Sequence, residues 1–340
     1  MNDGSLKTLF HPFEAGLIEG PGEGAKVLFL NAVPFGRLPE GFPPSISLQQ
    51  GFRPVFRQLA ESRHNVVPVA EGEGYDVILV LAGRHRGQNE LWVAEALQRA
   101  RPGGMIVIAG GKTEGGASLR KRMAGLLPID DYASKNHGVV FWLTRPEDVT
   151  QAVATLEADN PPTAIADGFI TLPGVFSQDH VDEGSRLLVQ NLPENLKGQA
   201  ADFGAGWGYL SVKLAERSPE IRAIDLFEAN HTACRAAEEN VAHLATGVAC
   251  RVLWHDLLAE PVERRYDVIV MNPPFHQGRA AEPSIGEGMI RAASRGLKPG
   301  GKLFLVANRQ LPYEPVLAGN FARSGELLRD TRFKLLWAVR

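Results

Sequence analysis

Short runs of apolar residues recur along the chain, separated by glycine or proline turns and by stretches with helical spacing. In the second half the runs cover residues 200–203, 221–227, 248–253, 267–271 and 303–307, and a closing run covers 332–339. Because they are continuous rather than alternating, they predict strands of a parallel sheet covered on both faces. We expect the closing run to be its edge strand. The pattern indicates a doubly wound α/β sheet, whose ligands lie at the carboxyl ends of the strands.

The two halves of the chain repeat one order of elements. In the first half a strand is expected at 75–80, a helix at 90–101, the turn Pro102-Gly103-Gly104 and a strand at 105–109. In the second half the same order occupies 266–270, 288–296, the turn Pro299-Gly300-Gly301 and 302–307. This repeat favours two duplicated α/β domains.

A cluster of helix-breaking residues marks the expected boundary between the halves. The segment Asn160-Pro161-Pro162-Thr163 follows a helix predicted at 148–158. We therefore predict a first domain at 1–160 and a second at 161–340. The first strand of the first domain, at 26–31, leads into Asn31 rather than into a glycine loop.

A glycine-rich turn follows the first predicted strand of the second half. It begins at Asp202, has glycines at Gly204, Gly206 and Gly208, and leads into a helix. Glycine lets such a turn tighten and lets a ligand approach the backbone. A dinucleotide fingerprint would need glycine at Tyr209. The spacing D-x-G-x-G-x-G is instead typical of class I methyltransferases, whose loop lies under the methionine part of S-adenosylmethionine and whose acid can address its ammonium group.

Acidic residues follow the next two strands. A carboxylate after the second strand can accept both ribose hydroxyls of a nucleoside. Glu228 and Asp225 compete for this role, and the spacing of Glu228 to the following helix fits better. Asp256 follows the third strand, where an acid can accept the adenine amino group; a helix-capping role for it is equally open.

The motif Asn272-Pro273-Pro274-Phe275 follows the fourth strand. Its prolines fix the backbone and remove two donors, so the local carbonyl groups face a site without competing N–H groups. The Asn272 side-chain oxygen and the Pro273 carbonyl can each accept one proton of a planar amino group, which favours a pyramidal nitrogen with its lone pair aimed at a methyl donor. Phe275 can stack on a planar target. We predict methyl transfer to an exocyclic nitrogen, with His276 as a possible substrate contact.

Composition changes this picture only modestly. The chain has 340 residues, of which 44% are hydrophobic and 22% charged, and its net charge is −3. It has only two cysteines, no long apolar run and no metal-ligand spacing. We expect a cytoplasmic protein without a membrane span or a metal, and a monomer is favoured. A local basic surface is either a solvated face or an RNA contact; its residues are Arg84, Arg86, Arg99, Arg101, Lys112, Arg120, Lys121, Arg122 and Lys135.

The motifs together resemble the RsmC/RlmG family of bacterial ribosomal RNA guanine-N2 methyltransferases. The matching segments are 174–177, 182–188, 202–208, 272–278, 307–313 and 332–334. The resemblance implies two tandem Rossmann-like class I methyltransferase domains. It also implies that the first is a degenerate copy that lost the cofactor and helps to hold RNA. By the same analogy Phe176 and the residues at 182–184 lie against cofactor and substrate.

The resemblance therefore implies methylation of guanine N2 in ribosomal RNA, most simply that of the small subunit, with S-adenosylmethionine as cofactor. Two alternatives remain. The same motif serves adenine N6 or a protein glutamine amide, because each is a planar amide-like nitrogen. A non-catalytic RNA-binding assembly factor is the second alternative, and the intact Asp202 and Asn272 argue against it.

Overall fold

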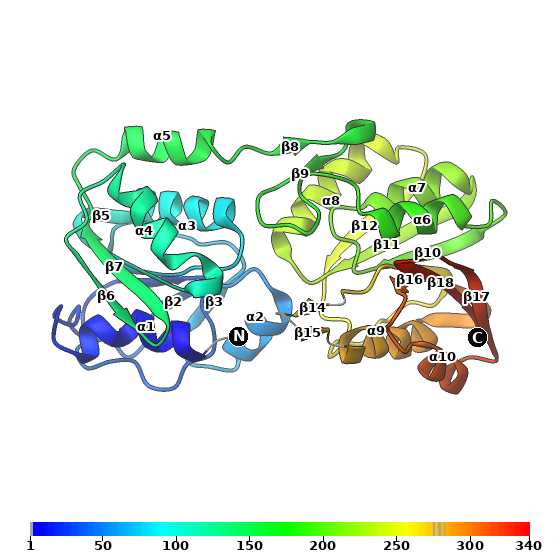
Figure 1. Cartoon of the computed structure of the whole chain (residues 1–340), viewed down its shortest axis with the longest axis horizontal. Helices are drawn as coiled ribbons and strands as arrows, with labels where there is room; N and C mark the ends of the chain where they lie inside the picture. Colours follow the sequence, from blue (N-terminus) through cyan, green and yellow to red (C-terminus); the bar gives the residue numbers. More distant parts are fainter. Residues whose placement is uncertain (1–2, 275, 278–279, 282) are drawn as a thin grey trace. The chain divides into compact units, whose positions relative to one another are not determined.

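The computed structural model describes residues 3–274, 276–277, 280–281 and 283–340. Its internal contacts divide the chain into two compact units, Met1–Pro161 and Pro162–Arg340. Each unit is a seven-stranded sheet with helices on both faces (Figure 1). The expected fold class, α/β with two tandem Rossmann-like methyltransferase domains, is confirmed.

In the first unit the strands lie in the order β3-β2-β1-β4-β5-β7-β6. The strands are β1 (Val27–Leu30), β2 (Ser47–Gln49), β3 (Asn65–Val67), β4 (Tyr75–Leu81), β5 (Ala100–Gly111), β6 (Asp131–Lys135) and β7 (Gly138–Thr144). The helices are α1 (Asp3–Glu14), α2 (Arg53–Ala60), α3 (Arg86–Arg99), α4 (Gly116–Ala124) and α5 (Thr150–Ala158), with a 3-10 turn at Lys112–Glu114.

In the second unit the order is β12-β11-β10-β13-β16-β18-β17. Its sheet strands are β10 (Lys197–Phe203), β11 (Glu220–Glu228), β12 (Ala249–Trp254), β13 (Tyr266–Met271), β16 (Leu297–Asn308), β17 (Arg323–Arg329) and β18 (Phe333–Val339). Its helices are α6 (Glu183–Asn191), α7 (Tyr209–Arg217), α8 (His231–Leu244), α9 (Pro283–Gly296) and α10 (Glu314–Asn320). Two small ladders, β8 (Thr163–Ala164) with β9 (Ile170–Thr171) and β14 (His276–Gln277) with β15 (Ala280–Ala281), and a 3-10 turn at Ala166–Gly168 complete it.

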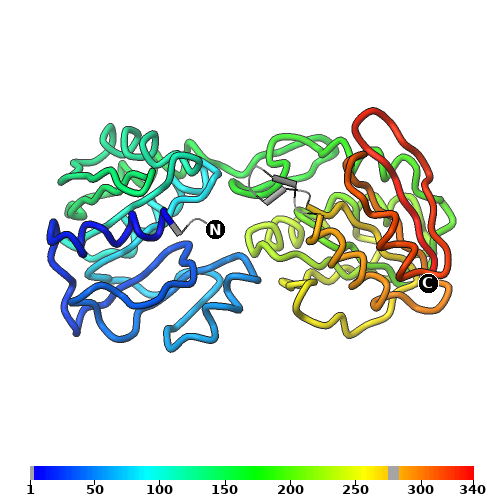
Figure 2. Tube along the Cα trace, turned by 60° about the horizontal axis from the view of Figure 1, so that its bottom comes forward, coloured from blue at the N-terminus to red at the C-terminus, as the bar shows by residue number. Residues whose placement is uncertain are grey.

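Both sheets share one topology, with five parallel strands, a sixth strand antiparallel to them and an edge strand antiparallel to the sixth. The closing hairpin β17–β18 is red in Figure 2. The expectation that the closing run forms the edge strand is wrong, because β18 lies between β16 and β17. Its continuous apolar sequence reflects neighbours on both sides. The true edge, β17, is largely polar and gave no apolar run.

The duplication extends to an irregularity in the central strands. The Pro-Gly-Gly turns expected between helix and strand lie inside β5 and β16 as bulges. Tyr75 pairs with Ala100 whereas Val77 pairs with Met105, and Tyr266 and Val268 pair with β16 in the same way. The first glycine of each Pro-Gly-Gly turn, Gly103 or Gly300, has a positive φ that suits glycine.

Alternating side chains of the second sheet form two separate cores, one on each face. Ile224, Leu226 and Val270 point into the core covered by α6, α7 and α8. Phe227 and Ile269 point into the opposite core, which α9 and α10 cover (Figure 1). The ends of the parallel strands are therefore fixed by packing from both sides.

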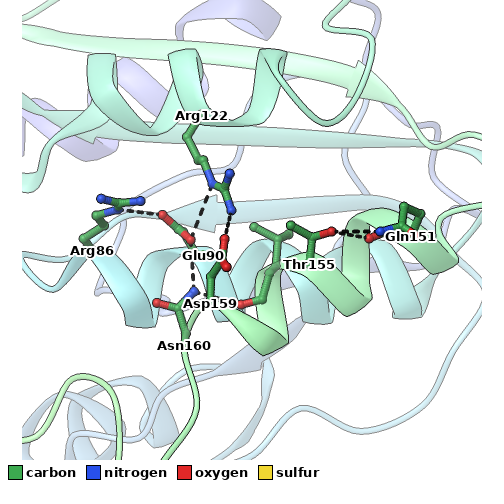
Figure 3. Close-up of polar contacts among 8 residues, drawn as sticks. Arg86, Glu90, Arg122, Gln151, Thr155, Asp159 and Asn160 are labelled. Carbon is green, nitrogen blue, oxygen red and sulfur yellow. Dashed lines mark hydrogen bonds and ion pairs between the residues drawn. The ribbon is translucent and has the colours of Figure 1, made fainter.

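A buried carboxylate secures the end of the first unit (Figure 3). Glu90 on α3 is 1% exposed and accepts hydrogen bonds from Arg86 (2.8 Å) and from the Asn160 side chain (2.9 Å). Arg122 on α4 pairs with Asp159, directly after α5. These contacts join α3, α4 and the last turn of α5, which is the point where the chain leaves the unit. None of the described helices is long and apolar enough to cross a lipid bilayer.

Candidate active site

The glycine turn joins β10 to α7 through three glycines with positive φ. Gly204, Gly206 and Gly208 all have positive φ values of 75°, 56° and 90°. Only glycine adopts such a run without steric cost. The turn is anchored to the next strand because the N–H groups of Gly204 and Ala205 donate to the Phe227 carbonyl at 2.8 and 3.1 Å. A Cβ added to Gly206 would meet no described atom within 4 Å, so open space lies beside it.

Glu228 ends β11 directly beside this turn. Its carboxylate accepts the N–H of Gly206 at 2.8 Å and that of Asn230 at 2.7 Å. Burial raises the pKa of Glu228, and backbone N–H groups, those of Asn230 and Gly206 among them, oppose the rise. Each carboxylate oxygen has two lone pairs, so both oxygens can accept a further hydrogen bond from a ligand.

Asp202 at the head of the turn is fully buried. The Ser211 hydroxyl donates to its Oδ2 at 2.8 Å, whereas no described residue bonds to its Oδ1. Burial, with a contribution from the nearby Glu228, raises the pKa of Asp202 to about 7 against the hydrogen bond from Ser211. A buried acceptor without a partner is costly in a folded protein. Asp202 is thus poised to gain from a cationic donor.

The competing acid, Asp225, is engaged elsewhere. It is 3% exposed, accepts two hydrogen bonds from Arg251 at 3.1 and 2.8 Å, and accepts the Tyr266 hydroxyl at 2.6 Å. Arg264 lies 3.6 Å away. These contacts give Asp225 a role in joining β11 to β12 and β13, and they leave Glu228 as the acid beside the glycine turn.

Asp256 follows β12 and is 6% exposed. Its Oδ1 accepts the Leu258 N–H at 3.0 Å, and its own N–H donates to Glu260 at 2.8 Å. The preceding residue, His255, donates its N–H to the Glu228 carbonyl. Asp256 therefore lies at the same sheet edge as Glu228, in a turn that its carboxylate stabilises.

Asn272 follows β13 and is held by residues at the start of α6. Its side-chain Nδ2 donates to Asp182 Oδ2 at 2.8 Å and to Ser185 Oγ at 2.9 Å. Pro273 is buried and Pro274 is exposed. Phe275 lies outside the described residues, and of His276 only the backbone, in β14, is described.

Trp207 is an unusually large residue for a glycine turn, and its contacts account for its presence. Trp207 is 4% exposed and packs its ring against Phe169 and Tyr209, at centroid distances of 5.1 and 5.6 Å. Its indole N–H donates to the Phe176 carbonyl at 3.0 Å. The side chain thus points away from the open side of the turn and holds the segment that carries Phe176, whose own side chain is 58% exposed.

The equivalent strand ends of the first unit are filled by its own side chains. Gln49 at the end of β2 accepts the Asn31 N–H at 3.0 Å, as Glu228 accepts that of Gly206. The Asn31 amide donates to Leu81, and Gln50 donates to Ala32. The amide of Gln49 stands where the second unit has the carboxylate of Glu228, and Asn31 stands where it has the glycine turn. The first unit therefore lacks both the acid that could bind ribose hydroxyls and the open turn.

The second unit therefore brings the glycine turn, Glu228 and Asn272 to one edge of its sheet, at the ends of the adjacent strands β11, β10 and β13. The family resemblance placed Asp182 near the site, whereas neither its contact with Asn272 nor the position of Ser185 could be predicted from the sequence. The one local signal is that Asp182 suits a helix N-cap, which predicts the start of α6 but not the contact with Asn272.

Comparison with known proteins defines first the class of the second unit. Residues 167–337 match the family described as "Methyltransferase small domain". Curated relatives then define the group. Over 266 residues the chain is 35% identical to "Ribosomal RNA small subunit methyltransferase C" of Hahella chejuensis, covering 73% of this chain and 72% of that protein. An Escherichia coli protein of the same name is 32% identical over 267 residues, covering 78% and 75%. The chain belongs to this ribosomal RNA methyltransferase C family.

A solved structure supports the same grouping over both units. The structure of "T. Thermophilus 16S rRNA N2 G1207 methyltransferase (RsmC) in complex with AdoMet and Guanosine" matches with a TM-score of 0.78 and 25% identity. The match covers 97% of this chain and 91% of that one. The predicted family is confirmed, and the enzyme class and cofactor expected from the sequence are those of this family.

Proposed function

We propose that this chain transfers a methyl group from S-adenosylmethionine to N2 of a guanine in 16S ribosomal RNA. The observation that carries the proposal is the convergence of the glycine turn, Glu228 and Asn272 at one sheet edge. The similarity to a 16S rRNA guanine-N2 methyltransferase over nearly the whole chain supports the choice of substrate. A ribosomal RNA substrate also favours the cytoplasm as the location, and we take the chain to act as a monomer.

The residues fit the proposed cofactor. The unpartnered Oδ1 of buried Asp202 suits an ammonium group, and the open space at Gly206 allows close approach of a ligand. Glu228 can accept two ribose hydroxyls while keeping its backbone bonds. Asp256 would accept the adenine amino group, and the exposed Phe176 would cover the ligand. Gly204 and Gly208 would keep the turn open.

The chemistry then depends on how the protein holds the target nitrogen. S-Adenosylmethionine supplies, when bound, an electrophilic methyl group. Asn272 Oδ1 and the Pro273 carbonyl would each accept one hydrogen bond from the amino group and so favour a pyramidal nitrogen. Their dipoles also stabilise the positive charge that develops there, before one proton leaves to water. Pro274 would keep the loop rigid and Phe275 would stack on the base.

The first unit would serve to hold RNA without binding a cofactor. Its strand ends are closed by Gln49 and Asn31, which supports a role other than catalysis. The test of the main proposal uses unmodified small ribosomal subunits and free 16S rRNA as separate substrates, with labelled S-adenosylmethionine. Digestion to nucleosides and mass spectrometry should give N2-methylguanosine in at least one arm.

Other products would identify the alternatives. Labelled N6-methyladenosine or labelled protein glutamine would replace the proposed substrate with another planar nitrogen. Cofactor binding without any transfer would point to a non-catalytic assembly factor. As a control, Asn272→Ala should bind S-adenosylmethionine nearly as wild type but lose roughly a hundredfold or more in turnover, the scale for one aligned polar group.

A further inference from the structure

Three side chains of the second unit close a small ring of hydrogen bonds beside the proposed target position. Asn272 Nδ2 donates to Asp182 Oδ2 and to Ser185 Oγ, at 2.8 and 2.9 Å. The same Asp182 oxygen accepts the Ser185 backbone N–H at 2.8 Å. Both hydrogens of the Asn272 amide are therefore used, and no described residue donates to its Oδ1.

The ring distinguishes the two ends of the Asn272 amide. An ionised carboxylate has no proton to donate, so only the –NH2 end of Asn272 can face Asp182. A flipped amide would place its oxygen against the Asp182 oxygen and would lose that hydrogen bond, whereas the Ser185 hydroxyl can donate as well as accept. The orientation of the amide is thus set by Asp182, with Ser185 as a second partner of the –NH2 group, and Oδ1 points away from both residues.

The partners are themselves held in place. Asp182 is the N-cap of α6, and Ser185 is only 7% exposed. A Cβ added to Gly184, between them, would lie 3.2 Å from the Phe333 ring and 3.3 Å from Val306, which shows how closely the start of α6 approaches β16 and β18. Because β16 is also the neighbour of β13, the start of α6 and Asn272 are fixed to one sheet.

We propose that Asp182 and Ser185 are positioning residues that fix the Asn272 amide with its oxygen towards the substrate amino group. The inference rests on the proposed function, since it assigns the acceptor role to Asn272 Oδ1. Without the ring the amide would populate both orientations, and the flipped one would present a donor to a group that also donates. The ring therefore acts on the chemical step rather than on cofactor binding.

The first test replaces Asp182 with serine. A serine still caps α6, but its hydroxyl both donates and accepts, so it no longer selects one amide orientation. We expect Asp182→Ser to lower kcat by roughly tenfold or more, the scale of a misaligned catalytic group, with cofactor affinity unchanged. The matched control is Asp148→Ser, because Asp148 accepts the Thr150 N–H at the start of α5 in the other unit. An Asp182→Ser enzyme with wild-type kcat would overturn the proposal.

The second test exchanges the two groups. Asn272→Asp alone places two carboxylates within hydrogen-bond distance and should abolish most activity. Adding Asp182→Asn supplies an –NH2 donor at position 182, in exchange for the oxygen that accepts the Ser185 N–H, and leaves a carboxylate oxygen at position 272 facing the substrate. We expect kcat of the double variant to be roughly tenfold or more above that of Asn272→Asp alone, since the second change restores a donor opposite an acceptor. A purely structural Asp182 predicts no recovery, and a double variant no more active than Asn272→Asp would overturn the proposal.

Two further measurements separate this inference from the proposed function. Melting temperatures of all variants must match that of Asp148→Ser, so that a kcat loss is not a folding loss. The nucleoside product of the wild-type chain is identified first. A product other than N2-methylguanosine refutes the proposed substrate, whereas the exchange experiment still tests the ring, because any amino substrate needs the same acceptor.

Discussion

Replacing Asp202 with asparagine removes a charge that the folded chain holds in its interior. Burial raises the pKa of Asp202 from 3.8 to about 7. Since each unit corresponds to about 1.4 kcal/mol, the ionised form costs the folded chain on the order of 4 kcal/mol at pH 8. Asparagine has the same shape and can still accept the Ser211 hydroxyl through its oxygen. Without cofactor, Asp202→Asn should therefore stabilise the second unit.

The effect has a defined pH dependence. An acid whose folded pKa is raised binds its proton more tightly in the folded state, so wild-type stability falls as pH rises from about 4 to about 7. At pH 5 the folded carboxyl is protonated, and the penalty is only about 2 kcal/mol. The advantage of Asp202→Asn should therefore grow by about 2–3 kcal/mol between pH 5 and pH 8.

Urea unfolding at both pH values, with the transition of the second unit followed separately, measures this difference. Asp167→Asn serves as the control, because the Asp167 side chain is 56% exposed and should give no comparable growth with pH. An advantage that is absent at pH 8, or that is equal at pH 5 and pH 8, would refute the reasoning about the buried carboxylate.

The remaining predictions concern the cofactor. Affinity for S-adenosylmethionine should fall about tenfold per pH unit below 7 and level off above it, as calorimetric titration can measure, because only ionised Asp202 pairs with an ammonium group. Gly206→Val should abolish cofactor binding, because the new side chain would fill the space beside the turn at a residue whose φ is 56°. The control is Gly247→Val, where an added Cβ also meets no described atom within 4 Å, and it should leave cofactor binding unchanged. Trp207→Phe should weaken binding several-fold by releasing the Phe176 carbonyl, on the scale of one hydrogen bond, and an unchanged dissociation constant would contradict this.

The sequence predicted those parts of the site that depend on residue type at a strand end. The glycine turn after β10, Glu228 after β11 and Asn272 after β13 were identified because each motif stands directly after an apolar run. Parallel strands bring their carboxyl ends together, so their proximity followed from the fold class. Their individual roles remain proposals that the variants above can test.

Contacts between distant segments could not be predicted from the sequence. The engagement of Asp225 with Arg251 and Tyr266 depends on which strands are neighbours. The contact of Asp182 with Asn272 joins residues 90 positions apart. Neither pairing has a periodic signal, because each depends on three-dimensional packing rather than on local spacing.

The basic surface considered for RNA illustrates the same limit. Arg86 pairs with Glu90 and Arg101 with Asp76, at 2.8 and 2.6 Å. Arg99 likewise pairs with a neighbouring acid on its own helix. With Arg122, which pairs with Asp159, four of the nine basic residues considered are therefore opposed by acids in space, and the pairing favours a solvated face for these four arginines over an RNA contact.

The amides that fill the strand ends of the first unit also determine a stoichiometry. A chain with two copies of one fold should titrate with a single equivalent of cofactor. Regaining a second site would require both an open loop at Asn31 and a carboxylate at Gln49, because the loop would provide space for a ligand and the carboxylate would accept its hydrogen bonds. Neither change alone supplies both, so the strand ends of this copy are free to diverge.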